Sequence, residues 1–258
     1  MNKPFILFLF STVTFLTSCK KNDLVSGTFK GPEVSMYSGK TWTRHELDVD
    51  GTPIQVAVVI DDAALKSVPI GTSPDHHEHA FSLKLDSRSS ALPYTHVVLN
   101  WNPGGHQPLS IYGKPHFDIH FYMISEAERM AIPAYRADTA KFKNYPASAY
   151  IPANYVNVDD GEPEMGAHWA DITSPELSTT NPEPFTQTFI YGSFNGKVIF
   201  YEPMMSLDFL KTTTGLERNI PQPAKYATKG FYPTKLRVVK RNGTTEIILD
   251  GFILRQAS

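Results

Sequence analysis

Three histidines and an aspartate are concentrated in one aromatic stretch, GGHQPLSIYGKPHFDIHFYMI, which covers residues 104–124. From His116 onward polar and apolar residues alternate, so a strand would place His116, Asp118 and His120 on one face. Imidazole and carboxylate groups are the ligands that proteins offer to zinc, manganese and iron, and both groups also act as general bases. The stretch therefore predicts either a working site or an ordinary polar face of a β-sheet.

The spacing on a strand limits which of these side chains can share one ion. Residues four apart lie about 13 Å from each other, and residues two apart lie about 6.6 Å from each other. His116 and His120 are thus too distant for a common ion unless a bulge bends the strand. Asp118 can pair with either histidine, or it can orient an imidazole as a metal-site carboxylate commonly does. The remaining ligands must come from other segments.

Three residues that are distant in sequence are candidates for these ligands. His106 follows two glycines in a loop, and His168 lies in a long proline-rich section. Glu202 belongs to a predicted hairpin around Asn195-Gly196, in which a two-residue loop would place it opposite Phe189 on an aromatic face. A buried carboxylate needs a cation, a metal or a hydrogen-bond donor. The expected ligands are His106, His116, Asp118, His120, His168 and Glu202, and the expected cofactor is a divalent zinc, manganese or iron ion.

The other histidines give a weaker signal. Residues 75–79 (DHHEH) look like a metal-binding tract, but a solvated turn after Ser73-Pro74 is the simpler interpretation. His45 and His96 are expected as single surface or interface residues, and His96 is alternatively a core histidine of an apolar strand.

The N-terminus predicts export. Lys3 precedes an apolar run over residues 5–16, which suits a secretory signal and is too short for a spanning helix. Leu16-Thr17-Ser18-Cys19 resembles the bacterial lipobox, whose cysteine is lipidated; a plain signal peptide is the alternative. We expect a lipoprotein signal peptide at residues 1–18, a tether lipidated at Cys19 over residues 19–35, and a single domain over residues 36–258. The expected location is the membrane of the bacterial cell envelope.

The composition excludes several classes of chemistry. Cys19 is the only cysteine, so the mature domain has neither disulfides nor a thiol nucleophile. The 24 basic and 26 acidic residues leave a net charge of −2 without a basic stripe, which argues against nucleic acid as a partner. The chain lacks the Gly-x-Ser-x-Gly elbow of serine hydrolases and any glycine-rich nucleotide motif in its usual context.

Turn residues predict an all-β or β-dominated domain, built as an antiparallel sandwich or barrel with a few short helices and long proline-rich loops. Asp50-Gly51, Asn195-Gly196 and Asn242-Gly243 separate runs that can pair as hairpins. In the last hairpin we expect Val238 opposite Ile247. Further strands are expected at 54–60, 80–85, 94–101 and 116–124. A capping box at 125–128 is expected to open a helix of about two turns, a second short helix is expected at 206–211, and the section at 133–184 is expected to be irregular.

Five sequence blocks can be compared with known families. They are Pro103-Gly104-Gly105-His106-x-Pro108, Pro115-His116-Phe117-Asp118-x-His120-Phe121-Tyr122, Met165-Gly166-x-His168-Trp169-x-Asp171, Phe200-Tyr201-Glu202-Pro203-Met204 and Gly230-Phe231-Tyr232-Pro233. Over about residues 35–250 the chain resembles a bacterial family of secreted proteins and lipoproteins, a domain of unknown function that includes a sigma-E-regulated Thermus protein. The resemblance implies a β-rich envelope protein that forms homo-oligomers, and it implies no activity. A weaker likeness to the cupins rests on His-x-Asp-x-His, where cupins have His-x-His.

Two hypotheses of function follow. In the first, a lipid-anchored envelope protein holds a His/Asp/Glu pocket for a divalent metal or a small polar ligand. An enzyme of this kind, cupin-like or otherwise, would carry out metal-assisted hydrolysis or oxygen chemistry with Glu202 or Asp118 as the base. In the second, the chain is a non-enzymatic, oligomeric structural or stress-response module, and its motifs serve packing.

Overall fold

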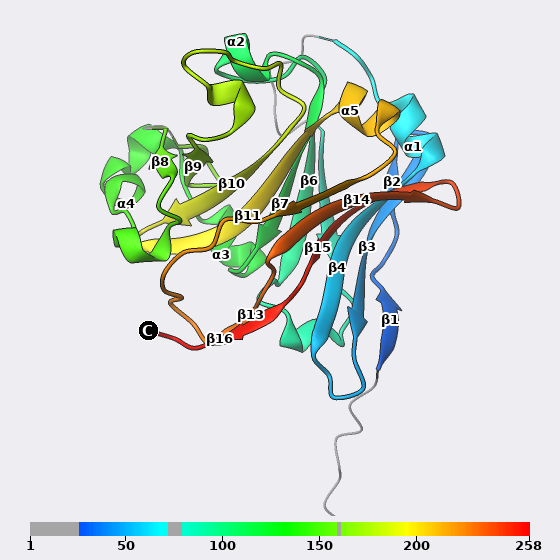
Figure 1. The fold of residues 1–258 in the computed structure, drawn as a ribbon, viewed down its shortest axis with the longest axis horizontal. Helices are drawn as coiled ribbons and strands as arrows, with labels where there is room; N and C mark the ends of the chain where they lie inside the picture. The colour runs from blue at the N-terminus through cyan, green and yellow to red at the C-terminus, as the bar shows by residue number, and fades with distance from the viewer. Residues whose placement is uncertain (1–25, 72–78, 159–160) are drawn as a thin grey trace, which may run out of the picture.

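The computed structural model describes residues 26–71, 79–158 and 161–258. The signal peptide, Cys19 and residues 75–78 of the histidine tract therefore lie outside the described residues. Two seven-stranded antiparallel sheets form a sandwich, and a two-stranded sheet lies beside them (Figure 1). The prediction of a β-dominated fold with a few short helices is confirmed. Within the described ranges, no helix is long and apolar enough to cross a membrane.

The first sheet has the strand order β1-β3-β4-β15-β14-β12, with β2 paired to β3. The predicted pairing of Val238 with Ile247 is present, and Asn242 and Gly243 both have the positive φ angles that a two-residue hairpin requires. Part of the segment expected as a tether pairs with β3 as β1 and β2. The strands of this sheet are β1 (Gly27–Lys30), β2 (Val34–Met36), β3 (Gly39–Leu47), β4 (Pro53–Asp61), β12 (Leu216–Asn219), β14 (Lys235–Arg241) and β15 (Thr244–Asp250).

The second sheet has the order β5-β6-β7-β11-β10-β9-β8, and a separate pair joins β13 to β16. The strands are β5 (Ala80–Lys84), β6 (His96–Asn102), β7 (His116–Tyr122), β8 (Tyr155–Asn157), β9 (Ala167–Asp171), β10 (Gln187–Phe194), β11 (Lys197–Ser206), β13 (Gly230–Tyr232) and β16 (Ile253–Arg255).

The helices are short, as the proline content predicts. The expected capping box opens one of them: Ser125 Oγ accepts from the Glu128 amide, and the Glu128 carboxylate accepts from the Ser125 amide. The α-helices are α1 (Asp62–Ser67), α2 (Leu109–Tyr112), α3 (Glu126–Met130), α4 (Thr139–Lys143) and α5 (Leu207–Thr212), and the 3₁₀ helices are η1 (Ser89–Ala91), η2 (Tyr135–Ala137), η3 (Ser148–Tyr150) and η4 (Pro175–Leu177).

The main core lies between the two large sheets. Phe117, Ile119 and Phe121 of β7 are fully buried there together with Val58 of β4 and Ile247 of β15. Because neighbouring residues of a strand point to opposite faces, this packing turns the alternate residues of β7 toward the outer face of the second sheet.

The described residues of the 133–184 section, 133–158 and 161–184, cover that outer face. They were expected to be irregular, but they contain β8 and β9, which extend the second sheet beyond β10. In Figure 1 the elements β8, β9 and α4 lie on the side of β10 and β11 that faces away from β3 and β4. Two small apolar clusters fix this cover, one around Phe142 and one around Phe185.

The β10–β11 hairpin corrects one predicted register. Asn195 and Gly196 form the two-residue turn, with φ angles of 48° and 82°. A bulge between Gly192 and Ser193 then shifts the pairing, so Glu202 lies opposite Ile190 and not opposite Phe189. A bulge inserts one extra residue, and the regular alternation of the sequence does not reveal it.

Candidate metal centre and its pocket

The outer face of β7 collects the predicted ligands between its two neighbours in the sheet. On the β6 side, Asn102 is opposite His116 and Val98 is opposite His120. On the β11 side, Phe200 is opposite Tyr122 and Met204 is opposite Asp118. Glu202, two residues from each of these β11 residues, therefore shares their face. Carboxylates and imidazoles from separate strands meet here under the cover.

The structure divides the six predicted ligands into two groups of three. In each group, one ligand atom from every residue lies within 4.8 Å of the others. The division follows from the strand spacing, which separates His116 from His120 as the sequence predicted. The first group is His120, His168 and Glu202, and the second group is His106, His116 and Asp118.

The first group is buried and poor in hydrogen bonds. Glu202 Oε1 lies 3.5 Å from His120 Nε2, and Glu202 Oε2 lies 3.8 Å from His168 Nε2. His120 and Glu202 are 1% and 2% exposed, yet neither ring nitrogen of His120 nor Oε2 of Glu202 has a hydrogen-bond partner. Buried polar atoms are usually paired, so unpaired ones require an explanation such as a bound ion or water.

The pKa values of this group follow from its burial. Burial lowers the pKa of His120 to about 3, against the opposing effect of the nearby Asp118 charge. Burial also raises the pKa of Glu202 well above its ordinary value, and the Asp118 charge adds to this rise. Both shifts favour neutral side chains, because burial removes the water that would solvate a charge.

The second group is arranged around Asp118. Its Oδ1 lies 3.2 Å from His116 Nε2, and its Oδ2 lies 3.3 Å from His106 Nε2. Asn102 Nδ2 donates to Oδ2 at 2.7 Å. Burial would raise the pKa of Asp118, but His116 and His106 outweigh it and hold this pKa well below its ordinary value. Burial lowers the pKa of His106, but the Asp118 carboxylate outweighs it, so the net shift is upward.

A glycine turn positions His106. Gly105 has a φ angle of 73°, and a Cβ atom there would lie 2.1 Å from the carbonyl oxygen of Tyr112. The His106 amide donates to the same carbonyl at 3.2 Å, which closes the loop over the end of β7. Only glycine permits this close approach, so the glycine directly before His106 has a structural reason.

Phe200 lies between the backbone of β10 and the first group. Its ring centroid is 4.9 Å from that of His120 and 5.6 Å from that of His168. On its other side, a Cβ at Gly192 would lie 2.0 Å from the ring. Phe200 therefore limits the orientation of both imidazoles, and Gly192 leaves the space that its ring occupies.

Both groups open into one large pocket of about 1130 Å³. Five of the six predicted ligands line it, whereas His116 lies behind Asp118 with no exposed surface. Most of the remaining wall is apolar. Its apolar residues are Pro108, Val156, Val158, Pro163, Met165, Ala170, Ile172, Leu177, Ile190 and Met204. A few convergent polar groups in an apolar cavity are typical of small-molecule sites.

Several residues near the site were not expected or were placed differently. Asn102 was missed, although its position on β6 makes it the neighbour of His116. His96 is a buried residue stacked on Tyr122 at a centroid distance of 5.0 Å, which agrees with the core alternative. His45 was expected as a single surface or interface residue; it is fully buried beside Phe29.

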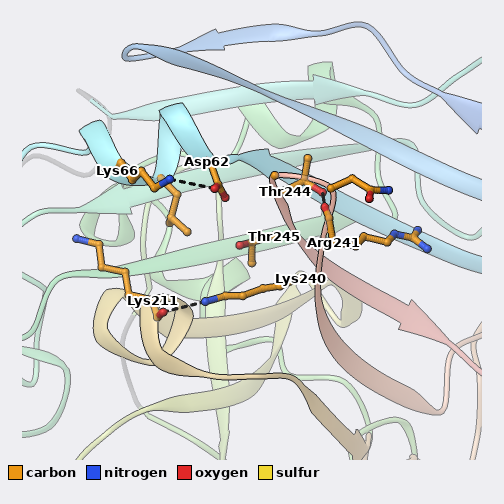
Figure 2. Close-up of a pocket in the computed structure, with 10 residues that line it drawn as sticks. Asp62, Lys66, Lys211, Lys240, Arg241, Thr244 and Thr245 are labelled. Carbon is orange, nitrogen blue, oxygen red and sulfur yellow. Dashed lines mark hydrogen bonds and ion pairs between the residues drawn. The ribbon is translucent and has the colours of Figure 1, made fainter.

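A smaller pocket of about 390 Å³ lies between α1, α5 and the β14–β15 turn (Figure 2). Three of its four cationic side chains have partners. Lys66 binds Asp62 at 3.0 Å, Lys240 donates to the Lys211 carbonyl at 2.9 Å, and Arg241 binds Glu246. These contacts stabilise the ends of two helices and a hairpin, so this pocket is not a candidate for the metal centre.

Comparison with models of known families, with curated proteins and with solved structures found no match to this chain.

Proposed function

We propose that the chain is a lipid-anchored envelope protein whose β domain binds a divalent metal ion through His120, His168 and Glu202 and presents it to a small molecule. The observation that carries the proposal is the buried group itself. Two imidazoles and a carboxylate from three different strands converge, and three of their polar atoms have no hydrogen-bond partner. A cation bound at His120 Nε2 would compensate this nitrogen and Glu202 Oε2 together, whereas Nδ1 points away from an ion on Nε2.

The ligand types favour zinc, manganese or iron over calcium or magnesium. Two imidazoles and one carboxylate form a set that suits transition metals, whereas calcium and magnesium prefer oxygen ligands alone. Three protein ligands leave at least one coordination position for water or substrate, which is the arrangement of catalytic rather than structural zinc sites. That position would face the pocket, because all three residues line it.

The pocket wall indicates the class of the small molecule. A ligand with a polar group for the metal and an apolar body would match the lining of valine, isoleucine, leucine and methionine side chains. A metal at this position would polarise a carbonyl or lower the pKa of a bound water. Metal-assisted hydrolysis is therefore the first reaction class to assay.

Metal content tests the proposal directly. Protein purified without chelators should contain stoichiometric zinc, manganese or iron by elemental analysis. His120→Ala and His168→Ala should lose one equivalent and keep the wild-type circular dichroism spectrum. The matched control is His79→Ala, which removes a histidine outside both groups that binds Tyr37 at 3.1 Å. Metal-free wild type, or equal metal in all variants, contradicts the proposal and favours a structural module.

A further inference from the structure

The structure assigns a second, separate cation site to His106, His116 and Asp118. This site would bind a divalent transition metal such as zinc. It uses none of the three ligands of the proposed centre, so either site can exist without the other. The sequence grouped all six residues as one set, and the division appears only in the folded chain.

The hydrogen bonds of the two imidazoles support this assignment. His116 Nδ1 is 2.6 Å from the carbonyl oxygen of Lys114, and His106 Nδ1 is 2.7 Å from that of Gln107. A carbonyl oxygen only accepts, so both Nδ1 atoms must donate. A neutral imidazole has one N–H group, and the lone pair of each ring is then on Nε2. Metal-binding histidines commonly donate their other nitrogen in this way, which fixes the ring orientation.

Both Nε2 atoms face Asp118. His116 Nε2 is fully buried and has no hydrogen-bond partner, and the Asp118 Oδ1 that it faces has none either. A lone pair opposite a carboxylate oxygen is repulsive unless a positive charge lies between them. The geometry leaves two occupants for this position, a metal ion or a proton on each ring.

The distances suit a metal ion. Ligand atoms that each lie about 2.0–2.2 Å from a tetrahedral zinc are roughly 3.3 Å apart. The two nitrogen–oxygen distances around Asp118 are 3.2 and 3.3 Å, whereas those around Glu202 are 3.5 and 3.8 Å. Each imidazole of the second group therefore lies at ligand spacing from its own oxygen of Asp118, His116 from Oδ1 and His106 from Oδ2. Asn102, which donates to Oδ2, holds the carboxylate in this orientation.

The site is also accessible. His106 and Asp118 line the pocket, and the side chain of His106 is 21% exposed. An ion can thus enter from the pocket and complete its coordination with water on that side. Because Asp118 and His120 are two residues apart on β7, ligands in the pocket could contact both ions.

Zinc titration of chelator-stripped protein tests the inference. The wild type should bind two equivalents of zinc, His106→Ala and His168→Ala should each bind one, and the double variant should bind none. Elemental analysis after gel filtration measures the bound zinc. Asp118→Asn is a second variant of the same site that preserves size, and it should also bind one. Circular dichroism verifies that each variant is folded.

The outcomes separate the two proposals. If the wild type binds one zinc and His106→Ala still binds it, the second site is overturned and the proposed centre is left intact. If the wild type binds one zinc that His106→Ala loses and His168→Ala keeps, the second site is supported and the proposed centre is overturned. One equivalent lost in both variants identifies a single shared ion and overturns the separate site, and zinc-free wild type overturns both.

Discussion

At the scale of single residues, the unusual feature is a set of polar atoms buried without partners on one face of a sheet. The sequence identified these residues because His116, Asp118 and His120 alternate with large apolar side chains. The sequence also predicted that His116 and His120 are too far apart to bind one ion, because the backbone fixes the spacing of residues along a strand. It could not assign His168 and His106 to their groups, since their positions depend on β9 and on the loop before β7.

His96 provides a residue-scale prediction on pH. Burial, followed by the Arg129 charge, lowers the pKa of His96 from 6.5 to about 4, so this side chain is neutral in the folded protein. Its stabilising effect is complete above pH 6.5 and is lost as the pH falls toward about 4, because the unfolded chain binds the proton first. We expect this histidine to account for a loss of about 2 kcal/mol over that range.

Urea unfolding at several pH values measures this contribution. His96→Phe keeps the aromatic stack on Tyr122, which has an interplanar angle of 8°, and removes the titrating group. The variant should therefore lose less stability than wild type between pH 6.5 and 4. Parallel losses in both proteins would show that His96 does not contribute.

At the scale of elements, the cover over the outer face determines whether the site is closed. The sequence predicted the hairpins and the capped helix α3, because Asn-Gly turns and capping boxes are local signals. It missed β8 and β9, which have three and five residues; β9 pairs with β10, and β8 pairs with β9. Strands this short are specified by tertiary contacts, so their sequence carries little periodic signal.

Phe142 on α4 anchors this cover. It is 1% exposed, and its ring centroid lies 5.2 Å from that of Tyr135 and 5.1 Å from that of Phe194. Phe142→Ala should destabilise the cover by about 3 kcal/mol, since removal of a buried phenylalanine leaves a cavity. Amide hydrogen exchange should become faster over residues 132–158 and remain unchanged in β3 and β4. Zinc affinity should fall although no ligand is altered.

Phe81→Ala is the matched control for this variant. Phe81 lies on β5, where its ring contacts Tyr37 at a centroid distance of 5.6 Å, away from the cover. It should reduce stability without faster exchange in residues 132–158. If Phe142→Ala accelerates exchange equally in every strand, the cover and the sandwich unfold as one unit and the prediction is wrong.

At the scale of the whole molecule, one sheet serves two purposes. Its inner face completes the main apolar core with the first sheet, and its outer face carries the ligand groups beneath the cover. The sequence predicted antiparallel β structure but did not distinguish a sandwich from a barrel, because that choice depends on the order of strands far apart in the chain. The export signal and lipid anchor remain predictions.

Crystals of the zinc-loaded protein provide the most direct test of the central claim. Anomalous diffraction at the zinc edge should give a peak about 2.0–2.2 Å from His120 Nε2, His168 Nε2 and a Glu202 oxygen. Zinc peaks confined to other positions, with His120 and Glu202 hydrogen-bonded to ordered water, would contradict the claim.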